Sequence, residues 1–123
     1  MATVVMKFGG TSVADLDRIA NVARHVAREV SAGNSVAVVV SAMAGTTNQL
    51  VDWVSETSAL HDGREYDAVV ASGEQVSAGL LAIRLQAMGL RARSWQGWQI
   101  PIYTSPDHGA ARINKIDASK LSD

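Results

Sequence analysis

The most informative segment of this sequence is Val4-Val5-Met6-Lys7-Phe8-Gly9-Gly10-Thr11-Ser12. Its apolar run predicts a buried strand, with the one charged residue, Lys7, near the carboxyl end. The two glycines let the backbone approach a ligand closely, and a helix start beyond them would supply unpaired N–H groups and the positive end of a dipole. A strand, a cation, two glycines and a helix start in this order are suited to binding a phosphate. A purely structural turn is the alternative.

A long amphipathic helix is predicted from about Val13 to Ser31, because apolar residues recur there every three or four positions. Ser12 is its expected N-cap, with Asp15 completing a variant of the capping box, and Gly33-Asn34 is expected to end it. The next apolar run, Val36–Val40, has no polar alternation. It therefore predicts a strand that is covered on both faces and belongs to a parallel sheet.

The sequence after this strand predicts two further helices, roughly over Asn48–Leu60 and Tyr66–Met88. The second of them is expected to break and restart at Ser72-Gly73-Glu74-Gln75, because glycine is costly inside a helix and Ser72 with Gln75 has capping-box spacing. Gly89 is expected to stop it. Its candidate core residues are Val69, Val70, Val76, Leu80, Leu81, Ile83 and Leu85.

The remaining signals are shorter. Arg91–Trp95 predicts a third strand, and residues 100–116 predict either a hairpin or a loop-rich cover around the turn at Ser105–Gly109. Residues 117–121 begin like a helix. Trp95 and Trp98 are expected to be core or interface aromatics, and Arg112 is either an anion contact or a solvated charge.

Alternating strands and helices, with connections long enough for crossovers, predict an α/β fold. We expect a three-layer α/β/α sandwich around a mainly parallel sheet. In such sheets ligands collect at the carboxyl ends of the strands. The segments Lys7–Ser12 and Ser41–Thr47 both follow a strand, so the topology is expected to bring them to one edge.

Composition limits the functional classes. The chain has 123 residues, which suits one domain, and a net charge of −1. There is no dense basic run, so we expect no nucleic-acid partner, and no apolar run approaches the length of a membrane span. Without cysteine there is neither a disulfide nor a cysteine metal site, and His25, His61 and His108 lack ligand spacing, so we expect no metal ligands. No secretory signal is recognised, and a cytoplasmic location is expected.

Two further groups of polar residues could carry chemistry. The loop Ser41–Asn48 offers hydroxyls and N–H groups that can hold a carboxylate or phosphate, although Thr47 could simply cap the next helix. Glu74 stands beside the expected helix break. It could be aimed into a cleft at a substrate ammonium, or it could simply complement the helix dipole.

Together these segments resemble a known family. Val5-Met6-Lys7-Phe8-Gly9-Gly10-Thr11-Ser12-Val13 strongly resembles the opening signature of aspartate kinases, in the amino-acid kinase superfamily. Ser41-Ala42-Met43-Ala44-Gly45-Thr46-Thr47-Asn48 resembles the second motif of that family, and Ala71-Ser72-Gly73-Glu74 the third. The stretch from Gly97 to Ile113 is also similar, so the resemblance extends over nearly the whole chain.

The resemblance implies that ATP phosphorylates the side-chain carboxylate of L-aspartate, the first step towards lysine, threonine and methionine. Lys7 would be the catalytic cation that neutralises charge on the transferring phosphoryl group, and magnesium would arrive with the nucleotide. Ser41 and Thr47 would help hold aspartate, and Glu74 would pair with its ammonium. The expected nucleotide-binding residues are Lys7, Phe8, Gly9, Gly10 and Ser12.

The resemblance also implies an incomplete site. Family members continue into an Arg-Gly-Gly-Ser-Asp-like segment, an adenine-binding region and usually ACT regulatory domains, none of which is found here. Residues 1–123 are therefore expected to be the N-terminal portion of the catalytic domain, inactive alone, with an apolar face that supports a homo-oligomer or another association. The alternatives are a binding or subunit-association module, and a kinase of this superfamily for another acidic substrate.

Overall fold

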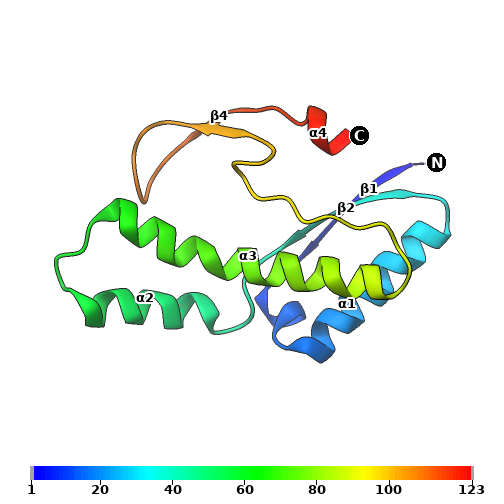
Figure 1. Ribbon diagram of the computed structural model, residues 1–123, viewed down its shortest axis with the longest axis horizontal. Helices are drawn as coiled ribbons and strands as arrows, with labels where there is room; N and C mark the ends of the chain where they lie inside the picture. The colour runs from blue at the N-terminus through cyan, green and yellow to red at the C-terminus, as the bar shows by residue number, and fades with distance from the viewer. Residues whose placement is uncertain (1, 123) are drawn as a thin grey trace.

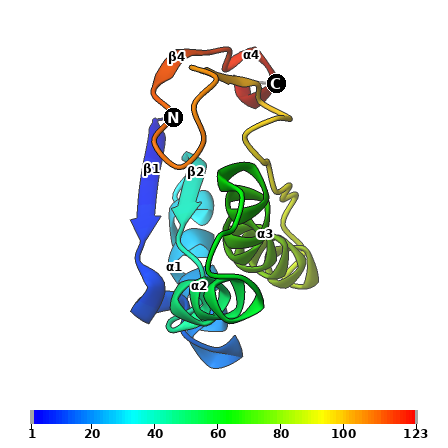
Figure 2. The ribbon, with the colours of Figure 1, turned by 90° about the vertical axis from the view of Figure 1, so that its left-hand side faces the viewer.

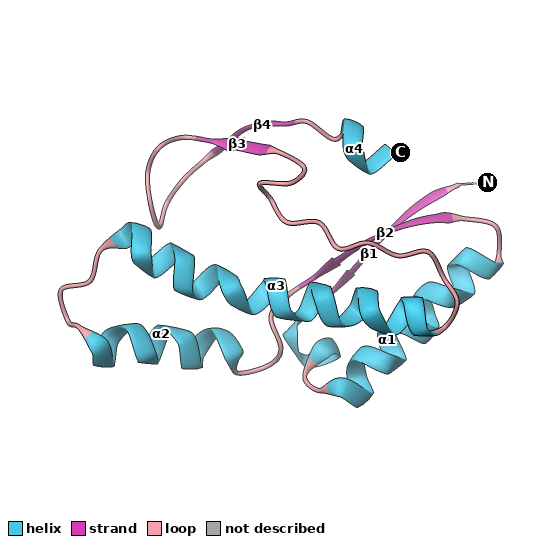
Figure 3. Ribbon diagram, viewed as in Figure 1, coloured by secondary structure: helices cyan, strands magenta, loops and turns pink. Residues whose placement is uncertain are grey.

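The computed structural model describes residues 2–122 and confirms an α/β chain with a parallel sheet (Figure 1). Its first half alternates strands and helices, and its second half is a long helix followed by a small hairpin (Figure 3). The elements in chain order are strand β1 (Thr3–Phe8), the 3₁₀ helix η1 (Gly10–Val13), α1 (Leu16–Ser31), β2 (Ser35–Val40), α2 (Thr46–Thr57), α3 (Gly63–Ala87), β3 (Ile102–Thr104), β4 (Ile113–Ile116) and α4 (Ser119–Ser122).

The two predicted strands of the first half are confirmed as a parallel pair. Their register runs from Thr3 opposite Ser35 to Phe8 opposite Val40. Alternate residues face the helices, and Figure 2 shows α1 and α3 on the same side of the pair. On the other face Val5 is 68% exposed and Val39 is 51% exposed. The expectation that β2 is covered on both faces is therefore wrong for the described residues, which place helices on one face alone.

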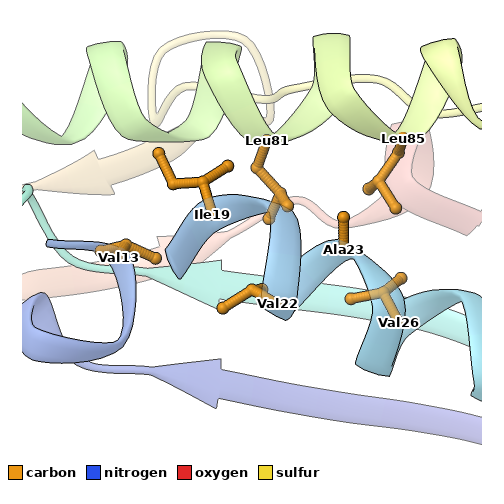
Figure 4. Packing of buried hydrophobic residues seen from close by; sticks show 7 residues of the cluster. All are labelled: Val13, Ile19, Val22, Ala23, Val26, Leu81 and Leu85. Atoms are coloured by element: carbon orange, nitrogen blue, oxygen red, sulfur yellow. The ribbon is translucent and has the colours of Figure 1, made fainter. Parts of the chain in front are cut away.

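The core lies between α1, α3 and the covered face of the strands (Figure 4). Leu81 and Leu85 of α3 point towards α1, where they meet Ile19 and Ala23. Met6, Phe8, Val36, Val38 and Val40 pack against this cluster from the strands. Burying these apolar side chains is the main favourable term in folding, so this three-way contact fixes the positions of the loops that follow the strands.

Helix α1 begins later than predicted, and Ser12 is not its N-cap. The residues after the glycine pair form a single 3₁₀ turn, in which Val13 is fully buried. Asp15 is the N-cap, and its carboxylate accepts a hydrogen bond of 2.8 Å from the N–H of Arg18. The C-terminal prediction is confirmed: Gly33 has a φ of +91°, and the N–H of Asn34 reaches back to Glu29 O at 3.1 Å.

Helix α3 is continuous, so the predicted break at Ser72–Gln75 is wrong. Gly73 is buried inside the helix, where its missing side chain serves close packing rather than a turn. The helix ends before Gly89, as expected. Of its candidate core residues Leu81 and Leu85 are buried, whereas Val76 is 53% exposed and Ile83 is 63% exposed.

Helix α3 bears on the expectation about membranes as well. By length and composition alone it could cross a bilayer, contrary to the expectation that no run approaches that length. One such helix is weak evidence, because the core helix of a folded domain passes the same test. Helix α3 packs against α1 and α2, and 22% of the candidate span is buried.

The segment after α3 forms no strand at Arg91–Trp95, contrary to prediction. There the side-chain amide of Gln86 donates to Ala92 O at 2.9 Å, in place of a ladder of backbone hydrogen bonds. The hairpin is confirmed as the antiparallel pair β3–β4. Its turn is attached to α3 through Asp67, whose Oδ2 accepts the N–H of Gly109 at 2.9 Å and lies 3.3 Å from Nδ1 of His108.

Candidate functional site

The first two motifs meet where β1 and β2 end. The N–H of Ser41 donates to Phe8 O at 3.1 Å, which extends the pairing of the strands by one residue. A Cβ built on Gly10 would lie 3.1 Å from Ala42 O. The second motif therefore approaches the first motif closely at Gly10, which has no side chain. The prediction that these two segments share one edge of the sheet is confirmed.

The third motif joins them from α3. A Cβ on Gly73 would lie 3.0 Å from the Cβ of Ala42 and 3.4 Å from side-chain atoms of Leu50 and Thr46. One turn later the hydroxyl of Ser77 donates to Ser41 O at 2.7 Å, across 36 residues of sequence. Three segments that are far apart in the chain therefore form one packed site.

Lys7 and Gly9 are the two residues expected to bind phosphate that are exposed, whereas Phe8, Gly10 and Ser12 are half-buried. Lys7 is exposed, and its place opposite Val39 puts it on the uncovered face of the sheet. A Cβ at Gly9 would meet nothing within 4 Å, so the backbone there is accessible. The expected dipole contribution is wrong, because the long helix starts only after Asp15, which caps it with a negative charge. Lys7 and the accessible backbone remain as the groups suited to an anion.

The second and third motifs present polar side chains at the same site. Thr47 is exposed in the first turn of α2, and it is not the cap of that helix: Gly45, with a φ of +81°, stands at the N-cap without a side-chain hydrogen bond. Glu74 is exposed beside the buried Gly73 and makes no ion pair with any described residue. Ser41 is half-buried, and its hydroxyl has no hydrogen bond within residues 2–122. All three can therefore receive a ligand.

A family model named amino acid kinase family matches residues 2–123. The chain belongs to the amino acid kinase family. A curated relative, the aspartokinase of Geobacillus stearothermophilus, is 47% identical over 121 residues, which cover 98% of this chain and 30% of that protein. This chain spans 28% to 31% of the length of eight such relatives.

Two solved structures resemble this chain. Aspartate kinase from Synechocystis is 48% identical with a TM-score of 0.66, over 68% of this chain and 14% of that one. Escherichia coli aspartokinase III, in complex with aspartate and ADP, has a TM-score of 0.76 over 93% of this chain and 35% of that one. Its identity is 22%, so this second likeness supports the fold alone.

Ser77 is a site residue that sequence reasoning missed. It is fully buried and is the one buried polar or charged residue recorded in the described chain. The signal that could have found it is its spacing: it follows Gly73 by four residues, so both lie on the helix face that meets the second motif.

Of the remaining candidate residues, Ser12 lies in the first motif, and Arg112, Trp95 and Trp98 lie after α3. Ser12 is half-buried and closes the 3₁₀ turn through its N–H to Gly9 O at 3.0 Å. Arg112 is exposed in the hairpin, where its N–H donates to the hydroxyl of Ser105 at 3.0 Å. Trp98 is 67% exposed, and the guanidinium of Arg93 lies 5.9 Å from the ring centroid of Trp95.

The depression recorded beside the site in the described residues is open to solvent. This shallow depression of about 490 Å³ begins at Ala44 and Gly45 and follows α2, but Lys7 and Glu74 do not line it. The described residues also contain no group of three or more His, Cys, Asp or Glu that could hold a metal ion.

Proposed function

We propose that this chain forms part of the catalytic site of an aspartokinase, which transfers the γ-phosphoryl group of ATP to the side-chain carboxylate of L-aspartate. The observation that carries the proposal is the contact among the three motifs at the carboxyl edge of the parallel strands. Such an edge is where α/β sheets bind ligands. Relatives named aspartokinase, at 42% to 48% identity over nearly the whole chain, support the choice of substrate.

The chemistry requires positioning and charge stabilisation. An aspartate side-chain oxygen forms a bond to the γ-phosphorus while the bond to the β,γ-bridging oxygen breaks, and ADP leaves with that electron pair. The attacking carboxylate is already ionised, so no strong base is needed. Lys7, exposed at the end of β1, would place its ammonium against the charge that spreads over the phosphoryl oxygens.

The other residues would bind the two substrates. Gly9 and Gly10 would offer backbone N–H groups to phosphate oxygens. Space for a ligand exists at Gly9, because a Cβ built there would have no neighbour within 4 Å. The hydroxyls of Ser41 and Thr47 would donate to aspartate, and the carboxylate of Glu74 would pair with its ammonium. An ion pair with Glu74 at the ammonium, together with hydrogen bonds from the two hydroxyls, would fix the orientation of the amino acid.

Magnesium, bound to the phosphates of ATP, would neutralise part of their charge when the nucleotide binds. The residues of this chain fit that arrangement, because they provide a cation and accessible backbone for phosphate rather than a set of acidic ligands. We also propose that the product serves lysine, threonine and methionine synthesis in the cytoplasm. Since the chain spans about 30% of its relatives, residues from the remaining length would complete the site, and residues 1–123 alone would turn over little or no aspartate.

A chimera tests this proposal. Residues 1–123 replace the matching segment of the Geobacillus stearothermophilus aspartokinase, and acyl phosphate formation is measured by hydroxylamine trapping together with ADP release. We expect aspartate-dependent turnover, and we expect Glu74→Gln to raise the KM for aspartate by about 10- to 100-fold, the effect of losing a charged hydrogen-bond partner. The KM for ATP should change little.

Glu65→Gln is the matched control, because Glu65 is another exposed glutamate of α3 that lies in its first turn. It should leave both KM values unchanged. A folded chimera without aspartate-dependent turnover would refute the proposed function. An aspartate KM that responds equally to both substitutions would refute the role of Glu74.

A further inference from the structure

Ser77 is buried at the contact between α3 and the loop that follows β2. Its side chain has no exposed surface, although a serine in the middle of a helix usually faces solvent or bonds only to its own helix. Burying a hydroxyl is unfavourable unless it is hydrogen-bonded. The position of Ser77 therefore depends on the acceptors around it.

The hydroxyl has two acceptors for its single proton. Ser41 O lies at 2.7 Å, and Glu74 O, one turn earlier in the same helix, lies at 3.2 Å. The bond within the helix would satisfy the hydroxyl without any contact with the loop. The shorter hydrogen bond therefore holds the loop, because its acceptor, Ser41 O, lies beyond the end of β2 and has no strand partner from that pairing.

The main chain of Ser41 is held from two sides. Its N–H donates to Phe8 O of the first motif at 3.1 Å, and its carbonyl accepts from Ser77. The next residue, Ala42, packs against Gly73: a Cβ built on Gly73 would lie 3.0 Å from the Cβ of Ala42. Gly73 and Ser77 are thus the contact residues of α3 for residues 41 and 42. Glu74 lies between these two contact residues in the sequence.

We propose that Ser77 is a positioning residue that sets the separation between the Ser41 loop and Glu74, and hence the affinity of the site for its amino-acid substrate. The proposal rests on the proposed function, in which Ser41 and Glu74 bind opposite ends of aspartate. Ser77 does not contact the substrate. Its hydroxyl acts through the main chain of Ser41, so its removal should weaken aspartate binding and leave the phosphoryl-transfer step largely intact.

Amide hydrogen exchange on the 123-residue chain tests the positioning directly. In Ser77→Ala we expect the Ser41 N–H to exchange about fivefold faster relative to core amides such as that of Val22, because one buried hydrogen bond is lost. Ser72→Ala is the matched control: the hydroxyl of Ser72 donates only within α3, to Val69 O at 2.6 Å. It should leave Ser41 unchanged. Equal exchange of Ser41 in all three proteins would overturn the proposal.

Steady-state kinetics of the chimera test the consequence. Ser77→Ala should raise the KM for aspartate about fivefold with kcat within about twofold of the parent, and Ser77→Thr, which keeps a hydroxyl, should restore the KM. A fall in kcat at unchanged KM, or no rescue by a folded Ser77→Thr protein, would overturn the proposal. If the parent chimera shows no aspartate turnover, the proposed function fails, and the exchange experiment still decides whether Ser77 holds Ser41.

Discussion

Substituting Gly73 with alanine tests whether the three motifs are packed as tightly as their geometry indicates. Inside a helix the change should favour folding by about 1 kcal/mol, because alanine is the better helix former. The new Cβ would, however, lie 3.0 Å from the Cβ of Ala42 and 3.4 Å from atoms of Leu50 and Thr46. Carbon atoms prefer separations of about 3.5–4.0 Å, and overpacking of this kind costs about 1–3 kcal/mol. We therefore expect a net loss of stability of up to about 2 kcal/mol.

Gly79 provides the reference for this measurement. It lies in the same helix, and a Cβ there would meet nothing within 4 Å, so Gly79→Ala should stabilise the chain by about 0.5–1 kcal/mol. Urea denaturation followed by circular dichroism gives both values, and the difference between them isolates the steric cost. A Gly73→Ala protein as stable as Gly79→Ala would show that the Ala42 loop moves freely, and the packed site described above would be refuted.

Two further predictions concern helix ends. Asp15→Ala should destabilise the chain by about 1 kcal/mol in urea denaturation through loss of the N-cap, and Asp17→Ala, which removes a first-turn acid that is not the cap, should cost less; equal losses would argue against capping. Hydrogen bonds from Ser119 lower the pKa of the Asp117 carboxyl from 3.8. Because its folded-state pKa is lowered, the ionised Asp117 stabilises the start of α4 at pH values above 3.8, and this stabilisation is lost as the pH falls through the folded-state pKa. The chemical shift of the Ser119 amide should therefore titrate with a midpoint below pH 3.8. A midpoint above 3.8 would contradict this.

The strands were predictable because their sequence leaves few choices. Val36–Val40 is a short, continuous apolar run that follows a helix-ending Gly33-Asn34, and the structure confirms both. The meeting of the first two motifs followed from topology alone, since parallel strands present their carboxyl ends at one edge.

The errors arose where tertiary contacts outweighed local preference. The low helix propensity of Gly73 predicts a break, but its lack of a side chain admits Ala42, and this contact exists only in the folded chain. Arg91–Trp95 has strand-like composition, yet no described strand lies beside it, and Gln86 binds its backbone instead. Ser77 was missed for the same reason, because its acceptor is 36 residues away.

The contacts that join the three motifs all lie between Phe8 and Ser77. The hairpin is attached to this part of the chain at the start of α3, through Asp67 and beside Gly63, and it touches none of those contacts. A crossover between relatives placed after α3 would therefore exchange everything downstream while transmitting the joined motifs unchanged. Recombination libraries cut at this point should retain the geometry of the site in parents whose remaining sequences differ widely.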